Sequence, residues 1–278
     1  MHGLSAQELL HIWEVAPRQH PVDRALTILA LALPKAPRDE LLALSVGQRD
    51  AHLLAVRERT FGGQLAGFAE CSACQERLEF VFDVADIRAM PQIEDGTGGA
   101  TKDVTGGAIN RAPTDLLPDY FVGEQNQAPT NQVYEVTIEG YDLRFCLPNS
   151  LDLAQVVRCG DVTAARNLLV QRCVLQASRD DGAVAVAALP EAVLTTLVES
   201  MGQFDPQAEI QLNLTCPACG QSWSVMFDIV SFFWSEICMQ AKRLLREVHT
   251  LARAYGWREA DILSMSAARR QFYLEMVT

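Results

Sequence analysis

The chain has 278 residues, 49% of them hydrophobic and 21% charged, which is enough to bury a substantial core or to form two modest domains. Its net charge of −12 argues against nucleic acid as the main partner, because contacts to phosphates require clustered lysine and arginine. The first residues lack the basic and apolar regions of a signal peptide, and the apolar run 25–33 is far shorter than the roughly 20 residues that span a bilayer. We therefore expect a cytoplasmic protein without membrane insertion.

Helices are predicted throughout the N-terminal segment, residues 1–64. Ser5, Pro21 and Ser45 each stand where a helix commonly begins, and Gly62 is suited to end the last one. The predicted helices cover residues 5–13, 21–33 and 46–60. The histidines are scattered without metal-binding or catalytic spacing, so no role is assigned to them.

A cysteine pattern occurs twice, in segments 65–90 and 209–230. It reads Cys71-Ser72-Ala73-Cys74 in the first segment and Cys216-Pro217-Ala218-Cys219 in the second. In both segments an alternating strand pattern follows and ends, at the same spacing, in a Phe-Asp dipeptide. A C-x-x-C turn places two thiolates on one side of a tight knuckle, and two knuckles supply the four ligands of a tetrahedral zinc site. The pattern predicts a split zinc ribbon whose metal joins two distant parts of the chain.

The predicted zinc ligands are Cys71, Cys74, Cys216 and Cys219. Four thiolates leave no open position on the metal, so this zinc would be structural and would not activate water. The other cysteines lie in apolar surroundings without ligand spacing and are predicted to be small core residues: Cys146, Cys159, Cys173 and Cys238.

Three alternatives compete with the zinc interpretation. Each pair is also compatible with a redox dithiol, although strand residues flank both pairs where redox motifs have a helix start. Gly220 suits the left-handed turn of a metal knuckle. Disulfides are the second alternative, and nothing places the chain in an oxidising compartment. A site that no longer binds metal is the third.

Residues 91–132 have a different character from the rest of the chain. They are rich in Gly, Thr, Asn, Pro and Asp and show little periodicity, which predicts a flexible insertion that limited proteolysis would cut first. Residues 116–122 form one apolar island within it. The glycines do not indicate a phosphate loop, because no G-K-[ST] sequence or strand-to-helix context accompanies them.

An α+β module is predicted for residues 133–208, between the two halves of the zinc site. Two alternating runs around Glu139-Gly140 indicate a β-hairpin. The predicted helices that follow cover residues 150–159, 162–176 and 190–201.

The C-terminal segment, residues 231–278, is predicted to contain the longest helix, residues 231–255 with Gly256 as its cap, and a final helix at 267–277. Its apolar stripe is first of all a core face. Residues 239–278 carry a net charge of +3 against −15 upstream. The basic face is either simply solvated or a docking surface for an acidic protein partner. The predicted fold class is α+β, mainly helical, with a split four-cysteine ribbon and a small hairpin-and-helix insertion.

The second half resembles a known family. The residues that carry the resemblance are Asp205-Pro206, Cys216–Gly220, Phe227-Asp228, Leu244–His249, Ala254–Trp257, Glu259–Leu263 and Arg269–Leu274. They resemble phage-type baseplate proteins related to the baseplate hub assembly chaperone of the T-even phages, which also occur with contractile injection systems. The resemblance covers residues 133–278, and the first cysteine pair extends it more loosely to the N-terminal residues. It implies a non-enzymatic protein that helps to build, or forms part of, a contractile-tail baseplate. Its partners would be baseplate or tail proteins, and it would stay in the cytoplasm or enter the tail-like particle.

Two other functions are weighed against this one. A zinc-ribbon adaptor for nucleic acid or transcription would present a basic ribbon, whereas Glu70, Glu76 and Glu79 make the first knuckle acidic. A metalloenzyme would need an open coordination position and a nearby base, and the sequence has no H-E-x-x-H or H-x-E motif.

Overall fold

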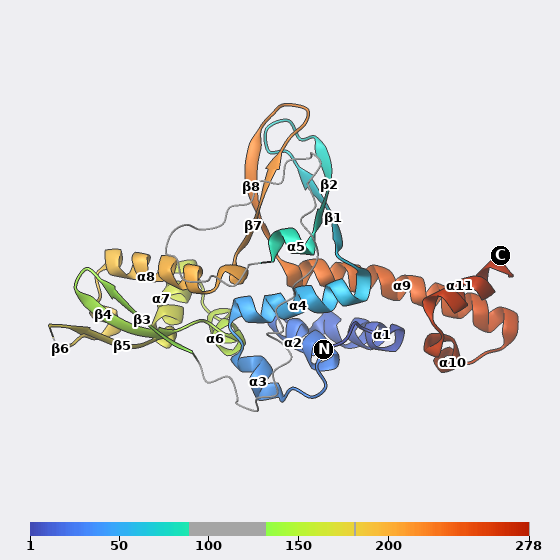
Figure 1. Ribbon diagram of the computed structural model, residues 1–278, viewed down its shortest axis with the longest axis horizontal. Helices are drawn as coiled ribbons and strands as arrows, with labels where there is room; N and C mark the ends of the chain where they lie inside the picture. Colours follow the sequence, from blue (N-terminus) through green and yellow to red (C-terminus); the bar gives the residue numbers. More distant parts are fainter. Residues whose placement is uncertain (89–131, 181, 278) are drawn as a thin grey trace, which may run out of the picture.

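The computed structural model describes residues 1–88, 132–180 and 182–277 (Figure 1). Its α-helices are α1 (Ala6–Val15), α2 (Pro21–Ala32), α3 (Arg38–Ala43), α4 (Val46–Phe61), α5 (Val84–Ile87), α6 (Ser150–Val156), α7 (Val162–Cys173), α8 (Glu191–Phe204), α9 (Ile229–Tyr255), α10 (Glu259–Ser264) and α11 (Ala267–Glu275). Its strands are β1 (Gln64–Glu70), β2 (Arg77–Asp83), β3 (Val133–Ile138), β4 (Tyr141–Cys146), β5 (Val174–Arg179), β6 (Gly182–Ala183), β7 (Ile210–Thr215) and β8 (Ser222–Phe227). The predicted flexible insertion, residues 91–132 with its apolar island, lies outside the described residues except for its last residue.

The helical body consists of α1 to α4 packed against the first half of α9 (Figure 1). Capping boxes begin α1 at Ser5 and α4 at Ser45, where each serine hydroxyl accepts from the third helical N–H and the Glu8 or Gln48 side chain returns a hydrogen bond. These signals are local in sequence, and the predicted helix starts at both positions are confirmed. The body forms the larger of two hydrophobic cores.

Helix α9 contributes its apolar stripe to this core. The buried residues of the stripe that lie in this core are Ile229, Val230, Phe233, Ile237, Ala241 and Leu244, and Leu251 is buried further along the same face. The helix ends where Gly256 adopts a left-handed φ of 68°, as its sequence predicted. Leu245, which follows the buried Leu244, is 37% exposed because it lies beside the buried face.

A buried ion pair fastens α4 to α9. The Arg57 guanidinium donates to both carboxylate oxygens of Glu236, at 2.8 and 2.6 Å, and also to the carbonyl oxygen of Gly62. The Arg57 side chain is 3% exposed and that of Glu236 17%. This bidentate guanidinium–carboxylate pair fixes the position of α4 relative to α9.

Replacing Arg57 by methionine is expected to lower the free energy of unfolding by about 2–3 kcal/mol, because charge-assisted hydrogen bonds are lost and Glu236 stays partly buried without its partner. Urea denaturation measures the effect. The matched control is Arg166→Met, which removes an ion pair to Glu191 on the surface and should cost less than about 1 kcal/mol. Equal costs for the two variants would contradict this assignment.

The α+β module, residues 132–204, contains the second core. Its antiparallel sheet has the order β3-β4-β5-β6, and α7 and α8 pack on it through residues such as Val170 and Leu197. The predicted hairpin of β3 and β4 is confirmed. Helix α7 ends at Cys173, where the prediction extended it to 176, because Val174–Arg179 instead pairs with β4 as a strand. Helices α3, α5 and α10 and strand β6 were not predicted either.

Asp205 joins this module to the helical body. It ends α8, and its carboxylate accepts hydrogen bonds from the Gly47 N–H at 2.9 Å and the Ser45 hydroxyl at 3.1 Å, both at the start of α4. Burial raises the pKa of Asp205, and the hydrogen bond from Gly47 partly offsets this effect. The Val46 N–H also reaches the Pro148 carbonyl at 2.9 Å. The start of α4 is therefore one contact between the two cores, and α6 adds another where it packs on α2 and α3.

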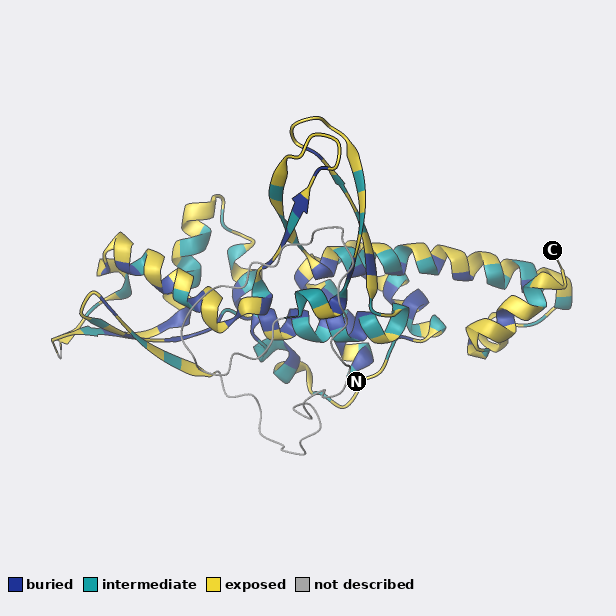
Figure 2. Ribbon diagram, turned by 45° about the horizontal axis from the view of Figure 1, so that its top comes forward, coloured by how far each residue is buried: buried dark blue, intermediate teal, exposed yellow. Residues whose placement is uncertain are grey.

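The second half of α9 carries α10 and α11 away from the body as an arm (Figures 1 and 2). Buried Arg270 of α11 donates to Glu247 of α9 at 3.0 Å and to the Met265 carbonyl at 2.7 Å, which holds the two helices together. Ile262 of α10 is fully buried, and α10 also contacts α1. The fold is α+β and mainly helical, as predicted. In the described parts of the chain, no helix combines the length and apolar character needed to cross a membrane.

Candidate metal centre

Two β-hairpins, β1–β2 and β7–β8, rise side by side from the helical body and bring their tips together (Figure 1). Their inner faces meet through apolar side chains: the Phe82 and Phe227 rings contact edge to face at 5.5 Å between centroids. Leu65 and Leu212 extend the contact downward into the main core. Successive side chains of a strand point to opposite faces, so each hairpin buries one face against the other hairpin and exposes the other face. The cysteine turns lie at the ends of the hairpins remote from the helical body (Figure 1).

The two cysteine turns have the same backbone geometry. Each is closed by two backbone hydrogen bonds at equivalent positions. In the first turn the Gln75 N–H donates to the Cys71 carbonyl (2.8 Å) and the Cys71 N–H to the Glu76 carbonyl (2.9 Å). In the second turn the Gly220 N–H donates to the Cys216 carbonyl (2.9 Å) and the Cys216 N–H to the Gln221 carbonyl (2.8 Å). The sequence repeat is therefore also a structural repeat.

Both turns use a left-handed residue directly after the second cysteine. Gly220 has a φ of 76°, as expected from its residue type, and Gln75 occupies the equivalent position with a φ of 61°. A residue with a Cβ is strained there by about 1 kcal/mol. The first turn keeps the knuckle geometry despite this cost, which indicates that the position of its cysteines constrains the backbone.

The four predicted ligands, Cys71, Cys74, Cys216 and Cys219, lie together. All their Sγ atoms are within 4.8 Å of one another, and the cross-hairpin distances are 3.7 Å for Cys71 to Cys219 and 3.6 Å for Cys74 to Cys216. A tetrahedron of thiolates at about 2.3 Å from a zinc ion has sulfur–sulfur edges of about 3.8 Å. The cluster therefore has the size of a four-thiolate metal site. All four cysteines are free, so the disulfide alternative does not describe this structure.

The surroundings shift the pKa values of the Cys71 and Cys74 thiols in opposite directions. A hydrogen bond from the Cys74 backbone N–H lowers the pKa of the Cys71 thiol to about 7. The Glu76 backbone N–H lowers the pKa of Cys74, but the thiols of Cys219 and Cys216 outweigh it and raise that pKa to about 12. Backbone N–H donors beside the sulfur atoms stabilise negative charge. The backbone donors thus favour thiolates, whereas the neighbouring thiols disfavour the thiolate of Cys74, and a cation at the centre would offset that effect.

Burial divides the cluster into two halves. Cys71 and Cys216, the first cysteine of each pair, are buried between the hairpins, whereas Cys74 and Cys219 are exposed. Every ligand position of a tetrahedral metal would be taken by sulfur, so the arrangement can hold a metal but leaves no place for substrate or water on it.

The remaining cysteines do not join this site. Cys146 and Cys173 are buried in the second core, where the Cys146 thiol donates to the Cys173 carbonyl at 3.5 Å, and Cys159 and Cys238 are half-buried. Among the described residues, no other group of His, Cys, Asp and Glu has the geometry to hold a metal ion. No family model, curated protein or solved structure matches the chain, so the residues themselves must support any assignment of function.

Proposed function

We propose that this chain is a non-enzymatic structural or assembly protein that holds one zinc ion and acts in the baseplate of a contractile tail or contractile injection system. The observation that supports the structural role is the closed cluster of four thiols, formed by two hairpins that are far apart in sequence. A metal held in this way joins the hairpins and stabilises the folded chain, as structural zinc does in small domains.

Zinc is proposed in preference to iron. Both metals occupy tetrahedral four-thiolate sites. Zinc has no redox chemistry and is the usual metal where the site only crosslinks the chain. Cys71, Cys74, Cys216 and Cys219 would hold it. Elemental analysis distinguishes the metals directly. The absorption spectrum does so too, because ferric iron bound by four thiolates is strongly coloured and zinc is colourless.

The contractile-tail setting is supported by the sequence resemblance of residues 133–278. Two features of the fold are compatible with an assembly role. The hairpins and the arm both project from the helical body and offer exposed surface to partners (Figure 2). The first hairpin carries Glu70, Glu76 and Glu79 against the single basic residue Arg77, and the second carries no charged residue, which disfavours the alternative of a nucleic-acid adaptor.

The proposal is tested in cells that produce a contractile tail together with this chain. Deletion of the chain is expected to abolish sheathed particles in electron micrographs. The wild-type chain and the control Cys159→Ser should restore them, and Cys216→Ser should not. Normal particles in the deletion strain would show that the chain has no part in tail assembly. Restoration by Cys216→Ser at wild-type yield would show that the metal site does not contribute to it.

A further inference from the structure

The two metal hairpins differ on their outer faces. The outer face of β1–β2, formed by Ala66, Phe68, Glu79 and Val81 between strand ends, exposes two large apolar side chains. Phe68 is 73% exposed and Val81 60%, and Glu79 lies directly opposite Phe68 in the strand register. An aromatic side chain this exposed on a short strand is not explained by folding of the hairpin itself.

The outer face of β7–β8 is polar by contrast. Its side chains pair with one another across the strands: the Thr215 and Ser222 hydroxyls lie 2.9 Å apart, and Ser224 donates to Asn213. Met226 is its one large exposed apolar residue among those described. Because both hairpins present cysteines in the same way, the metal does not require the difference between their outer faces. The apolar face of β1–β2 therefore indicates a contact with another surface.

The end of the C-terminal arm has the complementary character. Its aromatic rings form a continuous cluster: Tyr255 stacks on Trp257 at 4.4 Å, Trp257 meets Tyr273 at 4.8 Å, and Phe272 lies 6.2 Å from Tyr273. Phe272 is 61% exposed, and Met276 beside it in the sequence is 56% exposed. We call this cluster, with Arg258 and Arg269, the arm tip. Aromatic residues, methionine and arginine are the residue types enriched in protein interfaces.

The α9 part of the arm also presents more positive charge than its own acidic residues neutralise. On α9 the two acidic residues are both engaged internally, Glu236 by Arg57 and Glu247 by Arg270. The exposed charged residues that remain on this helix are basic: Lys242, Arg243, Arg246 and Arg253. Arg243 also pairs with Glu247, at 3.1 Å. Arg258, Arg269 and Arg270 at the end of the arm are balanced by Glu259, Asp261 and Glu275, so the net charge of +3 of residues 239–278 lies on α9. Residues 64–83, which form the β1–β2 hairpin, carry a net charge of −3.

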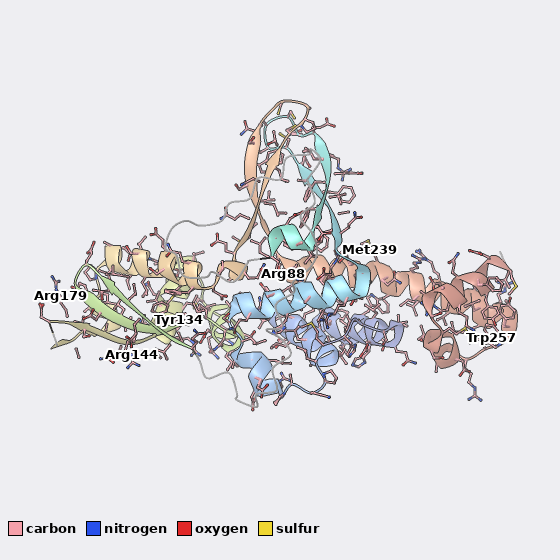
Figure 3. All side chains as sticks on the ribbon, viewed as in Figure 1. Arg88, Tyr134, Arg144, Arg179, Met239 and Trp257 are labelled. Atoms are coloured by element: carbon pink, nitrogen blue, oxygen red, sulfur yellow. The ribbon has the colours of Figure 1, made fainter. Side chains whose placement is uncertain are left out.

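We propose that the arm tip of one copy docks on the outer face of β1–β2 of a second copy. The contact would bury Phe272 and Met276 against Phe68 and Val81, and it would set the basic arm against the acidic hairpin. Association of two arms side by side would bring the basic surfaces of their α9 helices together, which disfavours that alternative. Within one chain the arm and the hairpins project in different directions, and Trp257 lies at the end of the arm remote from the hairpin tips (Figures 1 and 3).

Sedimentation velocity of the full, zinc-loaded chain tests the proposal. The chain is expected to associate with increasing concentration, and less strongly at high salt. Phe68→Ser and Phe272→Ser should each raise the concentration of half-association by about tenfold or more, as truncation of a central interface aromatic does. Both side chains are exposed, so melting and zinc content should stay unchanged. Met226→Ser is the matched control on the other hairpin and should associate like the wild type.

Mixing the two variants identifies the contact as one between unlike surfaces. Phe68→Ser retains an intact arm and Phe272→Ser retains an intact hairpin face, so the mixture should form a complex although each variant alone is monomeric. A monomeric wild type at all concentrations, equal loss of association in Met226→Ser, or no complex on mixing would each overturn the proposal. If the chain is monomeric and its arm binds a different acidic protein, the proposed contact with a second copy is wrong.

Discussion

Replacing Cys216 by serine is expected to abolish stoichiometric metal binding and to destabilise the protein strongly. Cys216 is a buried member of the four-thiol cluster, and a hydroxyl is a poor substitute for a thiolate on zinc. The wild type, purified under reducing conditions, should contain about one zinc ion per chain. A ligand present at 1,000 times its dissociation constant stabilises the folded state by about 4 kcal/mol, and the variant should lose stabilisation of that order.

Elemental analysis and thermal denaturation with and without a chelator measure this effect. The chelator should lower the melting temperature of the wild type towards that of Cys216→Ser and should leave the variant unchanged. Cys159→Ser is the control, since Cys159 is a half-buried cysteine outside the cluster. Wild-type protein that contains no metal, or that has a disulfide within each cysteine pair, would contradict the zinc assignment. Stoichiometric iron in place of zinc would support the four-cysteine metal site but show that its metal is iron.

Replacing Gly47 by alanine is expected to lower the free energy of unfolding by about 4 kcal/mol, because overpacking and the loss of buried charge-assisted hydrogen bonds act together. A Cβ at Gly47 would lie 2.0 Å from Oδ1 of Asp205 and 2.8 Å from the backbone nitrogen of Ala208. Asp205 would have to move, and its hydrogen bonds with Gly47 and Ser45 would be broken. The contact between the helical body and the α+β module would be the part that fails.

Gly202→Ala provides the control for this prediction. Gly202 lies in α8 close to the same joint, but a Cβ there meets no atom within 4 Å, so the substitution should stabilise the protein by about 0.5–1 kcal/mol through its helix propensity. In an Asp205→Ala background the cost of Gly47→Ala should shrink, since the main clash is gone. Urea denaturation of the four variants checks both expectations. A cost for Gly47→Ala that is the same in both backgrounds would show that Asp205 is not the obstacle.

Much of the helical framework could be predicted because its signals are local. The Ser5 and Ser45 capping boxes, the glycine after α9 and the three-to-four spacing of apolar residues each act within a few positions of the chain. The prediction failed at residues 174–176, which were assigned to the helix but form the start of β5. A free edge of β4 is available there, and pairing with it overrides the local helical preference.

The sequence by itself determined the repeated cysteine turns, since both ligand pairs, their spacing and the glycine of the second turn are encoded within short segments. Only the tertiary structure decided that the two turns meet, because their approach depends on Phe82, Phe227 and the core beneath them. The same holds for Asp205 at the start of α4 and for Arg57 on Glu236, where the partners are far apart in the chain. Such contacts leave no periodic signal: each depends on where packing places two helices or hairpins, and packing is a property of the whole core.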